Sequence, residues 1–177
     1  MKSKAMPAGR QGFTLIELLV YVAVFAILLT TISLFAIAFI KSTAKSRIKK
    51  EVSLGAYSAM KTMLYEIKRA NRVYTPTSIF DSHPGQLSLE TNQEAPEGEE
   101  ITYLDFYLDS ANKLYIKREG QDSRLLISEN FKVTNLEFER LASSSESVRI
   151  NLTLEYDTSA SEYQYSYSLS SSGSIRK

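Results

Sequence analysis

Apolar residues follow two successive patterns along the first part of the chain. Residues 13–40, from Phe13 to Ile40, form an apolar run that holds a single charged side chain, Glu17. A helix needs about 20 apolar residues to span a bilayer. The run is therefore long enough to cross a membrane.

Beyond this run, apolar residues recur in steps of three and four, which is typical of a helix with one buried face. They are Ile48, Val52, Ala56, Ala59, Met63, Ile67 and Ala70. No proline and one glycine, Gly55, occur between Phe13 and Tyr74. We predict a single helix from Phe13 to about Arg72. It should end before Pro76, because the residue before a proline disfavours the helical conformation.

The second half of the chain changes to short alternating segments, which predict strands joined by turns. The linker is expected at residues 75–85. The strands are expected at Leu87–Leu89, Ile101–Leu108, Lys113–Glu119, Arg124–Ser128, Phe131–Phe138, Val148–Tyr156 and Tyr163–Leu169. The apolar phase changes between Val133 and Leu136, which predicts a bulge near Thr134-Asn135. The serine-rich stretches Ser143–Ser147 and Ser168–Ser174 suggest a loop and a frayed tail.

These elements predict an α+β fold. The amphipathic half of a long N-terminal helix should pack on an antiparallel β-sheet that keeps one face in water. The length of 177 residues suggests one domain beside the apolar segment. We expect four segments: residues 1–12, a basic leader; 13–40, the apolar helix; 41–74, its amphipathic half; and 75–177, a β-rich head.

Composition excludes several classes of function. The net charge of +1 gives no overall electrostatic attraction for nucleic acid, so no nucleic-acid partner is expected. The absence of cysteine excludes disulfides and thiolate metal sites, and one histidine is too few for a zinc site. An exported domain of this composition must be held together by burial alone.

The one charge inside the apolar run is the most informative residue. A carboxylate at the bilayer centre costs about 2.5–3.5 kcal/mol on insertion scales, so an intramembrane acid indicates a function. Glu17 lies just after a Gly12-Phe13 junction, which follows the basic residues Lys2, Lys4 and Arg10. If the chain were cut after Gly12, the new amine of Phe13 would lie roughly 6 Å from Glu17, one helical turn away.

The residues Gly12-Phe13-Thr14-Leu15-Ile16-Glu17, behind a short basic leader, resemble the start of a type IV prepilin. The resemblance implies that a membrane aspartyl peptidase cuts after Gly12 and methylates the new N-terminus, Phe13. It implies that Glu17 is an assembly carboxylate, which pairs with the N-terminal amine of a neighbouring subunit. Residues 1–12 would then be the prepilin leader and residues 13–40 the transmembrane and assembly helix. The implied partners are other pilins or pseudopilins, the prepilin peptidase, an inner-membrane assembly platform and membrane lipid.

The second half is similar in pattern to the J-type minor pseudopilins of type II secretion and to related type IV minor pilins. The similarity lies in a meander that contains KLYIKREG and FKVTNLEFERL, at residues 113–120 and 131–141. Many major pilins carry a C-terminal disulfide loop, which a chain without cysteine cannot form. The resemblance implies a minor pilin or minor pseudopilin near a filament tip, which primes assembly and has no enzymatic activity and no cofactor. An adhesin or DNA-uptake tip subunit is the alternative.

Three competing roles for the apolar run fit the sequence less well. A secretory signal peptide has an apolar core of 7–15 residues, whereas the core before a cut at Ala36-Ile37-Ala38 would be longer and would contain Glu17. A plain membrane anchor leaves Glu17 and the Gly12-Phe13 junction without a function. A buried core helix without a polar face could not be covered by so small a domain.

Charge counting gives a conflicting topology. The positive-inside rule weighs lysine and arginine near both ends of a span. The leader offers fewer of them than the far side, which carries Lys41, Lys45, Arg47, Lys49 and Lys50. The resemblance nevertheless implies a single-pass protein of the cytoplasmic (inner) membrane whose head lies outside the cytoplasm, later incorporated into a filament.

Other polar clusters predict no chemistry. His83 lies in the tetrapeptide 81–84, which we interpret as a solvated turn rather than a catalytic group. The acidic residues Glu94, Glu97, Glu99 and Glu100 lack the ligand spacing of a calcium loop, so we interpret them as a solvated loop. Lys41, Lys45 and Lys49 share one helical face and are expected to reach lipid phosphates, with acidic groups of neighbouring subunits as the alternative.

Overall fold

The computed structural model describes residues 13–141 and 146–176. The chain divides into two compact units, of which the first ends at Ala44 and the second begins at Lys45. Helix α1, Leu15–Arg69, contributes residues to both units. The predicted helix is confirmed within three residues at each end, and it ends well before Pro76.

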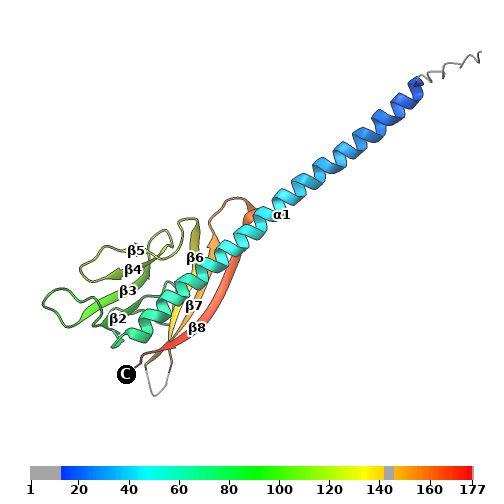
Figure 1. Ribbon diagram of the computed structural model, residues 1–177. Coiled ribbons are helices and arrows are strands. Elements are labelled where there is room, and N and C mark those ends of the chain that lie inside the picture. The colour runs from blue at the N-terminus through cyan, green and yellow to red at the C-terminus, as the bar shows by residue number, and fades with distance from the viewer. Residues whose placement is uncertain (1–12, 142–145, 177) are drawn as a thin grey trace, which may run out of the picture. The chain divides into compact units, whose positions relative to one another are not determined.

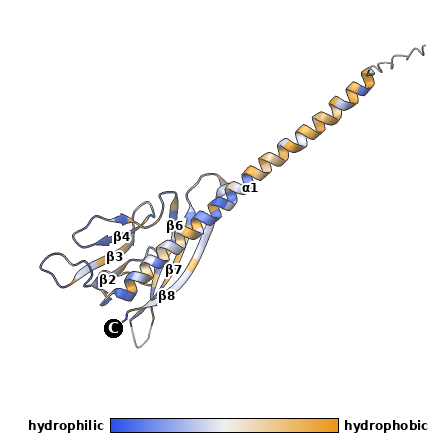
Figure 2. Ribbon diagram, in the orientation of Figure 1, coloured by the Kyte–Doolittle hydropathy of each residue, from blue (hydrophilic) through white to orange (hydrophobic). Residues whose placement is uncertain are grey.

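In the first unit, α1 is apolar on every side. Its large hydrophobic side chains from Leu15 to Ile40 are all exposed, and Figure 2 shows this part of the helix as almost uniformly hydrophobic. Thr30, Thr31 and Ser33 each donate their hydroxyl to the carbonyl four residues earlier, at 2.8–2.9 Å. A helix in an apolar medium needs such hydrogen bonds within itself, because no water is there to bond its polar groups.

In the second unit, α1 buries the stripe that its sequence predicts. Val52, Ala56, Ala59, Met63, Ile67 and Ala70 are all buried, and Ile48 is half-buried. Met60 joins them one turn after Ala56. The stripe packs against the strands that Figure 1 shows behind the helix, and together they form one continuous core.

The strands form two antiparallel sheets, where the sequence predicts one. The first sheet has the order β1-β2-β3-β4-β5, with β1 Arg72–Val73, β2 Leu87–Thr91, β3 Thr102–Leu108, β4 Leu114–Arg118 and β5 Arg124–Leu125. The second has the order β6-β7-β8, with β6 Phe131–Leu141, β7 Ser147–Tyr156 and β8 Ser166–Ser174. The division falls between β5 and β6, which belong to different sheets.

The predicted bulge in β6 is confirmed. The register of β6 against β7 shifts between Val133 and Asn135, whose partners are Leu154 and Thr153. Phe131 and Val133 are buried before the shift, and Leu136 and Phe138 after it. The bulge thus keeps apolar side chains of both phases on the core side of the sheet.

The predicted frayed tail, Ser168–Ser174, is wrong. These serines belong to β8, which pairs with β7 from Ser166 to Ser174. Gly173 is buried, and a Cβ atom there would lie 3.1 Å from Leu64 and 3.2 Å from Ile67 of α1. Close packing on the helix therefore outweighs the weak strand preference of serine.

The predicted last strand also includes Tyr163, which instead ends a short 3₁₀ helix, η1, Ser161–Tyr163.

Strand β2 also departs from the expected alternation, because all five of its residues are buried. Among them, the Glu90 carboxylate is paired with Arg72 at 2.6 Å. Ser88 accepts a hydrogen bond from the Thr77 hydroxyl at 2.8 Å. These partners compensate the two polar side chains for their loss of water.

We expect Phe138→Ala to lower the free energy of unfolding by about 3–5 kcal/mol, because its fully buried ring lies in the core that joins the second sheet to α1. Denaturant unfolding of the full chain in detergent micelles, followed by the near-UV circular dichroism of the tyrosines, measures this change. Leu54→Ala is the control, since Leu54 is 57% exposed and its loss should change stability by less than about 0.5 kcal/mol. Equal effects of the two changes would contradict the assigned core.

Candidate functional site

The N-terminus of α1 is closed by a reciprocal pair of hydrogen bonds between Thr14 and Glu17. The backbone N–H of Glu17 donates to Thr14 Oγ1 at 3.3 Å, and the backbone N–H of Thr14 donates to Glu17 Oε2 at 3.2 Å. The Thr14 hydroxyl also donates to Glu17 Oε2, at 3.2 Å. This arrangement is a capping box, in which two side chains satisfy backbone donors that the first helical turn leaves without partners.

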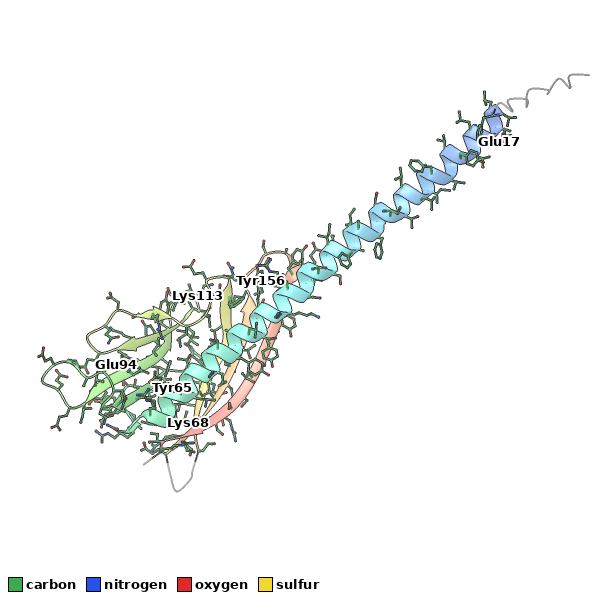
Figure 3. All side chains as sticks on the ribbon, in the orientation of Figure 1. Glu17, Tyr65, Lys68, Glu94, Lys113 and Tyr156 are labelled. Carbon is green, nitrogen blue, oxygen red and sulfur yellow. The ribbon has the colours of Figure 1, made fainter. Side chains whose placement is uncertain are left out.

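The capping box fixes where the Glu17 carboxylate points. Oε2 accepts both bonds from Thr14, whereas Oε1 has no partner among the described residues. Figure 3 shows Glu17 in the first turn of α1. A second acceptor oxygen is therefore held at the beginning of the helix and remains open to a cationic group from outside.

Phe13 lies directly before the capping box. It is 74% exposed, and its ring meets that of Tyr21 edge to face at 5.8 Å between centroids. The contact joins Phe13 to the second turn of α1. Gly12, the predicted cleavage residue, lies outside the described residues.

The sequence pattern predicts a function for Glu17 but leaves the role of Thr14 unassigned. The signal is present, because a threonine followed three residues later by a glutamate is the sequence signature of a capping box. The resemblance gives Glu17 an intermolecular role alone. The structure adds an intramolecular function, which is to begin the helix.

His83 is more than a solvated turn residue. Its side chain is exposed, yet its Nδ1 accepts a hydrogen bond from the backbone N–H of Leu136 at 3.0 Å. The loop around His83 is thus attached to strand β6. This contact gives His83 a structural function.

No group of three or more histidine, cysteine, aspartate or glutamate side chains that could hold a metal ion is found in the described part of the chain, which includes the acidic loop. Glu94 instead lies 3.4 Å from the guanidinium of Arg118. Arg118 also pairs with Glu66 of α1 at 2.9 Å, and both of these side chains are largely buried. This pair connects β4 to the helix, and the sequence does not predict it because no local spacing indicates it.

The predicted basic stripe of Lys41, Lys45 and Lys49 lies along α1, on both sides of the boundary between the two units. Lys49 lies 5.6 Å from the ring centroid of Tyr165, within the range of a cation–π contact. One member of the stripe therefore helps to attach the segment before β8 to the helix. Contact of the stripe with lipid or with neighbouring subunits stays a prediction.

A tyrosine pair further along α1 is a feature that the sequence does not predict. The Tyr167 hydroxyl donates to the Tyr57 hydroxyl at 3.0 Å, and the rings lie 5.8 Å apart. This hydrogen bond raises the pKa of Tyr167 above its usual value. The pair fixes the beginning of β8 against the helix.

Residues 7–38 match the model of a family described as the prokaryotic N-terminal methylation motif. The matched segment includes Gly12, Phe13, Thr14 and Glu17, and it supports a type IV pilin-like protein that is processed by a prepilin peptidase. Proteins of this kind are structural subunits that assemble with other pilins. No curated protein and no solved structure matches the chain.

We expect Thr14→Ala to weaken the start of α1 by about 0.5–2 kcal/mol, because it removes the hydroxyl that caps the Glu17 N–H. Amide hydrogen exchange in detergent micelles should then become faster in the first turn, at Leu15–Leu18. Thr30→Ala is the matched control, since its hydroxyl bonds only within the middle of the helix. Unchanged exchange in the Thr14 variant would contradict the capping box.

Proposed function

We propose that this chain is a minor pilin or minor pseudopilin, a type IV pilin-like subunit that is cleaved after Gly12 and methylated on Phe13. Residues 13–40 anchor it in the cytoplasmic membrane, with the β-rich head outside the cytoplasm. From there it enters a filament, near the tip of which it primes assembly. Its partners are other pilins or pseudopilins, the peptidase and an inner-membrane assembly platform.

The observation that carries the proposal is the fixed carboxylate of Glu17 within an apolar segment. Every large side chain around it, from Leu15 to Tyr21, is apolar or aromatic and exposed. In the apolar interior of a filament, an ion without a partner is strongly unfavourable, whereas a neighbouring cation offsets the loss of water. A correctly placed neighbour would supply that cation, so the pairing would favour one axial register of the subunits.

The capping box prepares Glu17 for this pairing. Cleavage after Gly12 creates a positive amine on Phe13, directly before the residue that holds the Glu17 carboxylate. Because Thr14 occupies Oε2, Oε1 is the oxygen that a neighbouring amine would contact. The side chain loses less conformational freedom on assembly than an unrestrained glutamate would.

The head supports a structural function. Several of its charged side chains form ion pairs between different elements, as Arg118 does with Glu66 and Lys113 with Asp157. The chain lacks the cysteines that close the C-terminal loop of many major pilins. This favours a minor subunit over the major subunit of a filament. The similarity of the head to J-type pseudopilins favours a place at the tip.

Gly12→Leu should block processing, since the resemblance assigns the cut to the bond after this glycine. Cells that express the variant should accumulate the uncut chain, visible as a slower band on a gel, whereas the wild-type chain should begin at a methylated Phe13 in mass spectrometry. Leu54→Ala, a change at an exposed position far from the junction, is the control for altered mobility. A native chain that begins at Met1 would overturn the proposal.

Glu17→Ala and Glu17→Gln should both insert into the membrane but lose at least about tenfold in incorporation into filaments. Glutamine can still accept the Thr14 N–H in a capping box but carries no charge. Thr14→Ala makes the opposite change, because it removes the cap and keeps the charge. Quantifying each variant in sheared filaments therefore separates the two functions of Glu17.

The charge is essential if both Glu17 variants fail and the Thr14 variant assembles. Normal assembly of Glu17→Gln would show that the cap is what matters and would contradict intermolecular pairing.

A further inference from the structure

Strand β8 is an edge strand with an unpaired side. It pairs with β7, and no other described strand adjoins it. At the two ends of the ladder, the carbonyl of Tyr165 accepts from Tyr156, and the N–H of Ile175 donates to Glu146. In an antiparallel pair the residues that bond to the partner alternate. The backbone groups directed away from β7 are therefore those of the five alternate serines Ser166, Ser168, Ser170, Ser172 and Ser174.

The opposite edge of the same sheet is covered. Along β6, the backbone N–H groups of Asp81 and Gly85 donate to the carbonyls of Phe138 and Leu136, each at 2.9 Å. Lys113 Nζ donates to the carbonyl of Phe131 at 2.7 Å. The loop before β2 and the turn before β4 thus protect β6 from further pairing.

The β8 edge has no comparable protection among the described residues. Proteins usually block open edges with lysine, proline or bulges. The strand reads SYSLSSSGS, which contains none of these residues, and its register against β7 is unbroken over nine pairs. Serine is small, so its side chains leave the edge accessible to another strand.

A groove adjoins this edge on the side of α1. It has a volume of about 400 Å³ and lies between the helix and residues Leu169–Ser171 of β8. Tyr57 and Tyr65, each about half exposed, form its apolar wall together with Leu64. Lys61 and Lys68, both exposed, supply positive charge (Figure 3 labels Tyr65 and Lys68).

The geometry of strand pairing defines which partner side chains enter the groove. Tyr167 and Leu169 face α1, whereas the side chains of Ser168 and Ser170 face the other side, where they bond to Thr153 and Asn151. Residues opposite one another in a ladder share a face, so partner residues opposite Leu169 and Ser171 would enter the groove. Lys61 and Lys68 are two turns apart, about 10 Å, and a strand covers about 13 Å in four residues.

A second copy of this chain fits the site poorly. Tyr167 lies by Tyr57, and Gly173 by Leu64 and Ile67, so β8 runs in the same direction as the second half of α1. Antiparallel pairing of two β8 edges would therefore make the two helices run in opposite directions. Subunits anchored in one membrane leave it in the same direction. The lysines of both grooves would also repel each other.

We propose that the β8 edge and the adjoining groove together bind an extended segment of a different protein chain. That segment adds a strand beside β8 and presents an acidic, an apolar and a second acidic residue at alternate positions. Main-chain hydrogen bonds to the serine edge supply affinity, and the groove supplies specificity. The apolar residue contacts Tyr57, Leu64 and Tyr65, while the acids contact Lys61 and Lys68.

The probe is a fluorescent nine-residue peptide in which Glu, Leu and Glu alternate with threonines, and the comparison peptide has Lys in place of Glu. Binding to the full chain in detergent micelles is measured by fluorescence anisotropy. We expect the acidic peptide to bind at least about tenfold more tightly than the basic one at low salt. No binding of the acidic peptide to the wild-type chain would overturn the proposal.

Ser170→Pro removes an outward N–H without removing a hydrogen bond to β7, and its ring obstructs the edge. It should lower the affinity for the acidic peptide at least about tenfold. Ser170→Ala is the matched control, because it also loses the hydroxyl bond to Asn151 but keeps the N–H, and it should bind as the wild type does. Equal affinity of the proline and alanine variants would exclude pairing at this edge.

The double variant Lys61→Glu with Lys68→Glu leaves β8 intact, so it tests the groove even if the proline variant does not fold. It should prefer the basic peptide, and an unchanged preference would overturn the assigned partner chemistry.

Sedimentation of the full chain checks for self-association, and dimers that Ser170→Pro abolishes would show a second copy as the occupant instead. None of these measurements depends on cleavage after Gly12 or on Glu17, so this inference and the proposed function can fail separately.

Discussion

The burial of one stripe of α1 against two separate sheets is the contact on which the rest of the head depends. Among the described residues, no hydrogen-bonded ladder joins the sheet β1–β5 to the sheet β6–β8. The small residues Ala56 and Ala59 allow both sheets to approach the helix, and the larger Met63 and Ile67 fill the space between them. The ion pair of Arg118 with Glu66 adds a polar connection to the first sheet, and the Tyr57–Tyr167 pair adds one to the second.

The same helix serves two different surroundings. Its second half is amphipathic because a core covers one face, whereas its first half is apolar all round and is covered by no described residue. A helix that is apolar all round is typical of a membrane span or of burial among other elements. Glu17 is the exception in its sequence, and its bond to Thr14 shows how an acid can begin a helix that is otherwise suited to an apolar medium.

Features that depend on local spacing could be predicted from the sequence. The stripe from Val52 to Ala70 follows from helical periodicity, and the β6 bulge follows from a change of phase after Val133. The assembly role of Glu17 stays a prediction. Features that depend on distant partners could not. The burial of Glu90 needs Arg72, the contact of His83 needs Leu136, and the strand character of the terminal serines needs both β7 and α1. The division into two sheets likewise depends on which strands pair, a long-range property that alternation does not reveal.

The hydroxyls of Thr30, Thr31 and Ser33 bond back to their own helix, and this has a consequence for the proposed transfer of the chain from lipid into a filament. Because these hydroxyls donate to carbonyls of the same helix, they do not donate hydrogen bonds to neighbouring helices or lipids. The helix is free to rotate about its axis and to exchange acyl chains for other helices without breaking a lateral hydrogen bond. In the proposed filament, the rotational orientation of the subunit would then be set by its charged first turn.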